Sequence, residues 1–164
     1  ARGFDRAAIM ALATGQYLSR GEAVIVTGAT GTGKSWLATA LGYQACSDGK
    51  TVRYYNLAKL FEAIDDARIA SSLSKLFDRL GQIDLLILDD FGVKPLDGQQ
   101  LLDLMEIIDD RYGRKSTIIA SQLPVASWYD VLKKNTTAAD AILDRIVHTA
   151  TRFELKGQSL RKKH

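Results

Sequence analysis

The sequence predicts an α/β fold in which one parallel β-sheet is covered by helices on both faces. Strand-like and helix-like segments alternate along the chain, and this alternation is typical of parallel strands joined by helical crossovers. The segment DLLILDD at 84–90 contains a continuous apolar run, as expected of a strand that is buried on both faces. We therefore expect a three-layer α/β/α domain.

Five segments carry the short apolar runs that predict strands. In chain order they are EAVIVT at 22–27, TVRYYN at 51–56, DLLILDD at 84–90, STIIAS at 116–121 and TRFEL at 151–155. Because helical segments separate them, the strands are expected to run parallel to one another.

The segments around these strands carry apolar residues at helical spacing. In chain order the expected helices are 4–18 with a weak point at Gly15, a helix starting within 28–36, one or two helices over 57–80 broken near 70–72, a helix that contains Leu101 and Ile108, and 137–148. Leu37, Leu41 and Ala45 share one stripe of the second helix. Gly113 lies just beyond the fourth, where glycine is favoured.

Length and composition indicate a single globular domain over residues 1–164, with 1–20 as a helical lead-in. The chain is 46% hydrophobic and 25% charged, and its net charge of +3 permits an anionic partner without requiring one. We expect a cytoplasmic protein without membrane contact, because no apolar run is long enough to cross a bilayer and no signal peptide opens the sequence. The single cysteine, Cys46, is expected to be a small buried residue.

The segment GATGTGKSW at 28–36 fits the phosphate-binding loop pattern G-x-x-x-x-G-K-[ST] and lies between a strand and a helix, as that pattern requires. Glycines allow backbone amides to point at phosphate oxygens, and the start of the helix favours an anion. Lys34 is expected to bridge the β- and γ-phosphates, and the Ser35 hydroxyl to ligate Mg²⁺. The expected nucleotide-binding residues are Gly28, Thr30, Gly31, Thr32, Gly33, Lys34, Ser35 and Trp36.

Two acids end the strand at 84–90, at the edge of the sheet where ligands collect in α/β proteins. We assign Asp89 to Mg²⁺, mostly through water, and Asp90 to polarising the attacking water. The alternative is that both residues only cap the next turn. Asp90 is shorter than the glutamate that many such ATPases use, which would slow hydrolysis.

Polar residues also follow the strand at 116–121. If that strand lies beside the Asp89 strand, Ser121 or Gln122 can hydrogen-bond the γ-phosphate or the lytic water. The alternative for Gln122 is a turn residue before Pro124. In the helix at 137–148, Arg145 falls outside the buried arc and is expected to be exposed. Arg152, which follows that helix, is a second candidate of the same kind for a functional exposed arginine. The alternative for both is an ordinary solvated side chain.

Four segments together resemble the IstB-like transposition helper ATPases, AAA+ proteins related to the helicase loader DnaC and the initiator DnaA. They are GATGTGKSWLATALG, LLILDDFG, STIIASQLP and ILDRIVHTATRFELKGQSLRK. The resemblance covers nearly the whole chain. The phosphate loop alone is generic, whereas the last two segments are more specific.

The resemblance implies an AAA+ core with five parallel strands and the phosphate-loop strand central. As a departure from it, we expect no C-terminal helical lid, because the sequence ends soon after the last expected strand. The resemblance implies ATP and Mg²⁺ at an interface between identical subunits, with Arg145 as the arginine finger that reaches a neighbour's nucleotide. It also implies assembly on double-stranded DNA and a transposase partner. The family's N-terminal domain, expected to contact the transposase, is not recognisable here.

DNA contacts are expected by resemblance in the region 53–80, first at Lys59, Arg68 and Lys75. The alternative is an ordinary solvated helix surface, because acids such as Glu62 and Asp65 are interleaved with them. No base-reading motif is visible, so contacts would be mainly to phosphates and steeply dependent on salt.

Two other functions use the same loop. A helicase loader would share the core motifs, and the segments SQLP and ELKG favour the transposition helper over it. A small-molecule kinase would need an acceptor pocket and an arginine-bearing lid in the same chain, and neither is recognisable.

Overall fold

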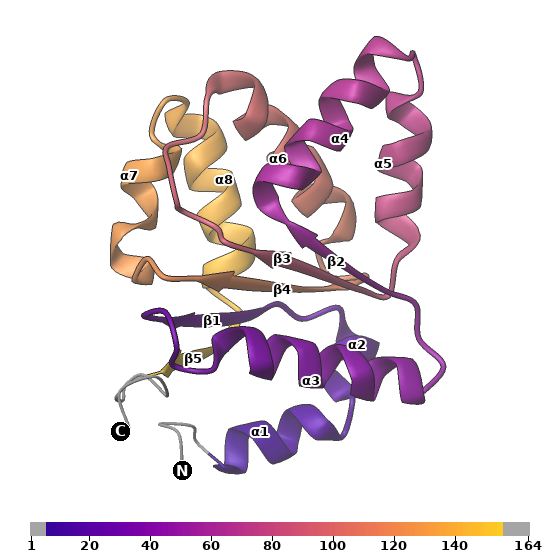
Figure 1. The fold of residues 1–164 in the computed structure, drawn as a ribbon, viewed down its shortest axis with the longest axis vertical. Helices are drawn as coiled ribbons and strands as arrows, with labels where there is room; N and C mark the ends of the chain where they lie inside the picture. Colours follow the sequence, from indigo (N-terminus) through magenta and orange to yellow (C-terminus); the bar gives the residue numbers. More distant parts are fainter. Residues whose placement is uncertain (1–5, 156–164) are drawn as a thin grey trace.

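In the computed structural model, which describes residues 6–155, five parallel strands form one sheet (Figure 1). The strands are β1 Val24–Gly28, β2 Val52–Asn56, β3 Leu85–Asp89, β4 Ser116–Ser121 and β5 Thr151–Leu155, in the spatial order β2-β3-β4-β1-β5. The predicted five-stranded parallel sheet is confirmed. The expectation that the phosphate-loop strand is central is wrong, because β4 inserts between β3 and β1 and takes the middle position.

One face of the sheet is covered by α1 Arg6–Ala13, α2 Gln16–Arg20 and α3 Lys34–Ser47, drawn below it in Figure 1. The stripe Leu37, Leu41 and Ala45 of α3 is buried against the sheet, as predicted. The break at Gly15 is also confirmed: this residue has φ 78°, in the left-handed region that glycine occupies without strain.

The opposite face is covered by helices that lie above the sheet in Figure 1. They are α4 Leu57–Ile69, α5 Leu73–Gln82, α6 Gly98–Arg111, α7 Trp128–Leu132 and α8 Thr136–Val147. The predicted break near 70–72 separates α4 from α5, and Ser71 there has φ 57°. The short helix α7 and the 3₁₀ turn Val125–Ser127 before it were not expected from the sequence.

Polar side chains fix the end of the sheet at which β2, β3 and β4 begin. The Asp84 carboxylate accepts hydrogen bonds from Thr51 N and Lys115 Nζ, both at 2.9 Å. These bonds lower the pKa of Asp84 to about 2, the bond from the Thr51 amide contributing most. The buried Arg111 guanidinium adds donations to Leu80 O and Ile83 O, both at 2.6 Å. The amino ends of three strands are therefore held in register.

Cys46 corrects one expectation, because its side chain is exposed. The buried position on that turn of α3 is taken by Ala45, so the apolar stripe passes one residue before the cysteine. Across residues 6–155 the structure contains no helix that is both long and apolar enough to span a membrane.

Candidate nucleotide-binding site

The loop between β1 and α3 approaches other backbone so closely that its first glycine has no room for a side chain. A Cβ atom at Gly28 would lie 2.5 Å from Thr32 Oγ1 and 3.0 Å from Leu155 O. Gly31 and Gly33 have φ values of 85° and 97°, which side chains rarely adopt. The glycines of the motif are therefore required by the fold of the loop as well as by any ligand.

The start of α3 leaves backbone donors facing this loop. The first amide that bonds back is that of Leu37, to Gly33 O at 2.9 Å, and Gly33 supplies no side-chain cap. The amides of Lys34 and Ser35 consequently lack an intrahelical acceptor. Lys34 is only 7% exposed and forms no ion pair with another residue in the part of the chain that the structure describes. A buried cation beside the first amides of a helix is suited to bind an anion.

The remaining residues of the predicted loop occupy two different positions. Thr32 is buried and its hydroxyl donates to Ala29 O at 2.7 Å, which closes the loop on itself. Thr30 is exposed at the outside of the loop. Trp36 is 54% exposed on the first turn of α3. The binding roles of these residues stay predictions.

Asp89 is brought directly to the start of α3. Ser35 Oγ donates to Asp89 Oδ2 at 3.3 Å, and the backbone amide of Asp90 donates to Asp89 Oδ1 at 2.8 Å. A hydroxyl and a carboxylate side by side are suitable ligands for Mg²⁺, which commonly takes one or two protein ligands and completes its shell with phosphates and water. The residues present thus fit the expected Mg²⁺ ion at Ser35 and Asp89.

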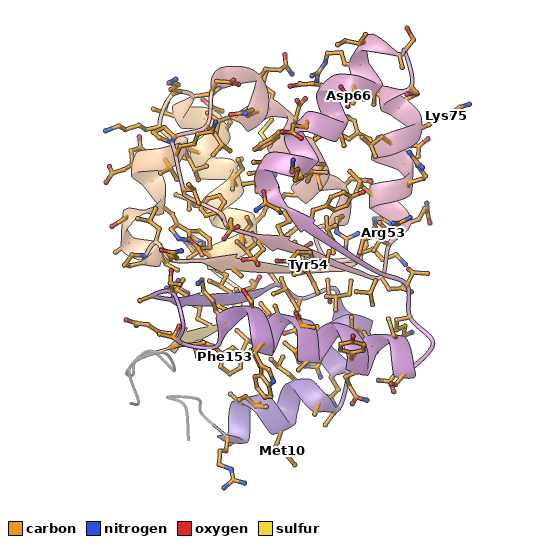
Figure 2. The ribbon with its side chains drawn as sticks, in the orientation of Figure 1. Met10, Arg53, Tyr54, Asp66, Lys75 and Phe153 are labelled. Atoms are coloured by element: carbon orange, nitrogen blue, oxygen red, sulfur yellow. The ribbon has the colours of Figure 1, made fainter. Side chains whose placement is uncertain are left out.

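Sequence reasoning missed Tyr54, whose hydroxyl also donates to Asp89 Oδ2. Burial, and next the hydrogen bond to Asp89, raise the pKa of Tyr54 above its ordinary value, so the hydroxyl keeps its proton at neutral pH. Tyr54 lies on the edge strand β2 (Figure 2), two residues before Asn56, the partner of Asp89 in the sheet. The order of the strands in the folded sheet places Tyr54 beside Asp89, and the sequence around Asp89 alone does not contain that information.

Asp90 follows Asp89 in a conformation that is uncommon for a residue with a side chain, with φ 59°. Its carboxylate accepts a hydrogen bond of 2.6 Å from the Asn56 side-chain amide. Asn56 also caps α4, by accepting from Ala58 N at 3.0 Å. Sequence reasoning missed this residue, which holds Asp90 at the same end of the sheet as the phosphate loop.

Gln122 lies at the same end of the sheet, because β4 pairs with both β1 and β3 and Ser121 is in register with Thr27. The Ser121 hydroxyl is buried and already committed, since it donates to Phe91 O at 2.5 Å and accepts from Leu123 N at 2.9 Å. Gln122 itself is exposed. Of Ser121 and Gln122, the geometry therefore favours Gln122 as the residue that can reach a ligand.

Trp128 on α7 fixes the turn that carries Gln122. The indole Nε1 donates to Leu123 O at 2.8 Å, and the ring packs on Phe91 with centroids 4.5 Å apart. The side chain of Trp128 is fully buried. The unexpected helix α7 thus locks together the turns that follow β3 and β4.

Arg145 lies at the opposite end of the sheet. It occupies the last turn of α8, which leads into the amino end of β5, and it lines a hollow of about 270 Å³ together with Glu22, Ala23 and Thr117, which precede or begin β1 and β4. The phosphate loop follows the carboxyl end of β1. Arg145 therefore does not belong to the nucleotide site of its own chain. Arg152, on β5, is exposed and donates to Val147 O at 3.4 Å.

The three predicted DNA-contacting residues have different surroundings. Arg68 bonds the nearly buried Asp103 carboxylate at 2.6 Å, which ties α4 to α6. Lys59 forms an exposed pair with Glu62 at 3.4 Å. Lys75 is exposed and extends outward from α5 in Figure 2. Contact with DNA stays a prediction for all three, and Arg68 has a structural partner that competes with it.

The strand order, the glycine loop and the acid at the end of β3 define the class of the protein as a P-loop NTPase of the AAA+ type. The chain belongs to the IstB-like ATP-binding protein family, whose model matches residues 1–164.

Sequence relatives agree with this assignment. The chain is 48% identical to the insertion sequence ATP-binding protein y4pL of Sinorhizobium fredii, over 98% of this chain and 65% of that protein. It is 32% identical to the IS21 ATP-binding protein of Pseudomonas aeruginosa, over 98% and 60%. The chain thus spans roughly two thirds of the length of these relatives.

Among solved structures, the DnaC helicase loader superposes with a TM-score of 0.75 at 20% identity, over 92% of this chain and 87% of that chain. DnaI superposes with a TM-score of 0.77 at 18% identity, over 92% and 85%. These similarities establish the shared fold.

Proposed function

We propose that this protein is a Mg²⁺-dependent ATPase of the cytoplasm that assembles on duplex DNA and assists a transposase. The observation that carries the ATPase proposal is the contact of Ser35 with Asp89 at the start of α3, beside the buried Lys34. The similarity to insertion sequence ATP-binding proteins supports the link to transposition.

Each residue of the site has a separate task in this proposal. The amides of the loop and Lys34 hold the triphosphate, while Ser35 and Asp89 hold Mg²⁺. Mg²⁺ bound there neutralises charge on the phosphates. Asp90 accepts a proton from the attacking water, with its carboxylate oriented by Asn56. Gln122 hydrogen-bonds the γ-phosphate or that water.

Hydrolysis in this proposal requires a second copy of the chain. Arg145 lies at the far end of the sheet from its own loop, so only the Arg145 of a neighbour can approach a given nucleotide. Head-to-tail contacts of this kind are heterologous and generate rings or open helices. Arginine fingers in other NTPases raise turnover by roughly 10³–10⁵-fold.

A helicase loader is the second candidate for the function. It is supported only by structural similarity to DnaC and DnaI at 20% and 18% identity, which concerns the fold. The 48% identical relative is an insertion sequence protein, which favours the transposition helper.

The proposal is tested by measuring ATP turnover per subunit against protein concentration, with and without duplex DNA. We expect turnover to rise steeply with concentration and with DNA, and Arg145→Ala to abolish the rise while nucleotide affinity is retained. Lys34→Ala, as the control, should lose nucleotide binding altogether. Turnover that is independent of concentration and DNA would contradict the proposal.

A further inference from the structure

Arg145 is held by three groups of its own chain. Its Nε lies against the Asp109 carboxylate of α6, its NH1 donates to Ala141 O at 3.2 Å, and its guanidinium carbon lies 5.9 Å from the centre of the Tyr112 ring. Its side chain nevertheless remains 31% exposed. The guanidinium is therefore fixed in direction without being buried.

The donors of the guanidinium divide into used and available ones. An arginine has five N–H donors, of which Nε carries one and the two terminal nitrogens carry two each. Asp109 and Ala141 engage the Nε and NH1 sides. These two contacts use two of the five N–H groups, and because the side chain is partly exposed, other N–H groups can meet an external anion.

The surroundings are suited to receive an anionic group from outside. The hollow of about 270 Å³ beside Arg145 is also lined by Arg20, Lys115 and Tyr112. Arg20 and Lys115 are paired with Glu22 at 3.7 Å and with Asp84 at 2.9 Å. Arg145 is paired as well, with Asp109, and three cations, each beside an acid of the same chain, therefore border the hollow.

We propose that Asp109 and Tyr112 are positioning residues that preorganise Arg145 for the nucleotide of a neighbouring copy of the chain. The inference rests on the proposed function, because it requires Arg145 to act across an interface. Long arginine side chains lose rotamer freedom when they are ordered. A guanidinium that is oriented before assembly loses less of it when the anion is bound, which favours the transition state.

The experiment is a double-mutant cycle in the intact protein on duplex DNA, at protein concentrations that saturate turnover. Asp109→Ala is expected to lower kcat by about tenfold, the effect of losing one partly exposed charge-assisted hydrogen bond. It should leave nucleotide affinity and the extent of assembly unchanged. In the Arg145→Ala background, Asp109→Ala should have no further effect, because Asp109 acts only through Arg145.

Asp110→Ala is the matched control. Asp110 is the next residue on α6, has a similar exposed fraction of 54% against 51%, and pairs with Arg114 rather than Arg145. The substitution Asp110→Ala removes one negative charge, as Asp109→Ala does, and should leave kcat unchanged. Asp109→Asn, which keeps an acceptor for Nε, should fall between Asp109→Ala and the unmodified protein. A thermal melt of each variant checks that the fold is retained.

The outcomes separate the inference from the function on which it rests. If Arg145→Ala is as active as the unmodified protein, both the inference and the role of Arg145 across the interface are wrong. If Arg145→Ala is slow and Asp109→Ala is fast, only the inference is overturned. Equal loss from Asp109→Ala with and without Arg145 would make Asp109 a purely structural residue and would also overturn it.

Discussion

Asp90 combines an unusual backbone conformation with a fixed side chain. Its φ of 59° is tolerated by aspartate and asparagine better than by most residues, and the Asn56 amide holds its carboxylate at 2.6 Å. Both features limit the positions that the carboxylate can take. Asparagine at this position can adopt the same backbone and still accept the bond from Asn56.

Asp90→Asn is therefore expected to retain the fold and ATP affinity while turnover drops by about 10²-fold or more, the usual contribution of a general base. Calorimetric titration with a slowly hydrolysed ATP analogue measures the affinity, and phosphate release measures the turnover. Turnover equal to that of the unmodified protein would show that another group activates the water.

At the residue scale, sequence analysis identified features formed by residues close together in the sequence and missed contacts between residues far apart in it. The loop from Gly28 to Ser35 is local, so its pattern and its geometry coincide. Tyr54 and Asn56 contact Asp89 and Asp90 from another strand, and Asp109 contacts Arg145 from another helix. Such contacts depend on which elements become neighbours, and no single segment records that.

At the element scale, the predicted DNA-contacting surface on α4 and α5 contains two kinds of basic residue. Arg68 bonds Asp103, whose side chain is only 6% exposed and whose other side-chain partner is Gln99 at 3.0 Å. Lys75 is solvent-exposed on α5. The first residue contributes to packing between helices, whereas the second remains exposed, as its predicted contact with a DNA phosphate would require.

We expect Arg68→Ala to lower the free energy of unfolding by about 1–2 kcal/mol, because a nearly buried carboxylate loses its counter-charge while Arg68 itself is partly solvated. Lys75→Ala should leave stability unchanged, weaken DNA binding for all sequences alike and lower the salt slope by about one. Denaturant melts and DNA titrations at several salt concentrations measure both. An unchanged salt slope would remove Lys75 from the DNA surface.

Element boundaries were predicted well where periodicity and a break agreed. The helix at 137–148 is observed at Thr136–Val147, and the strand at 151–155 is observed at Thr151–Leu155. The helix α7 was missed because Trp128–Leu132 is too short for a helical period to be visible, and its fully buried tryptophan is fixed by tertiary contacts. The burial of Cys46 was predicted wrongly because the apolar stripe passes through Ala45.

At the scale of the whole molecule, the two halves of the proposed catalytic site lie at opposite ends of one sheet. Lys34 begins α3 beyond the carboxyl end of β1, and Arg145 lies beside the amino ends of the strands. A variant that lacks one half still carries the other half intact. Defects at the two ends can therefore compensate one another between subunits.

A mixture of Lys34→Ala and Arg145→Ala subunits is expected to recover turnover that neither variant shows alone, because some interfaces join an intact loop to an intact arginine. Equimolar mixing at constant total protein, followed by phosphate release, measures the recovery. Failure of mixed subunits to recover activity, in assemblies shown to contain both, would argue against a site shared between chains.

If Arg145 acts across an interface, as proposed, its placement also sets a counting rule for assemblies that do not close. In an open row of subunits, the terminal loop at one end meets no neighbour and the terminal arginine at the other end meets no nucleotide. Complete sites then number one fewer than the subunits, and a lone subunit has none. Growth of the row and closure of a ring would each raise the ATP turnover per subunit. ATP turnover per subunit would then measure how far the protein has polymerised.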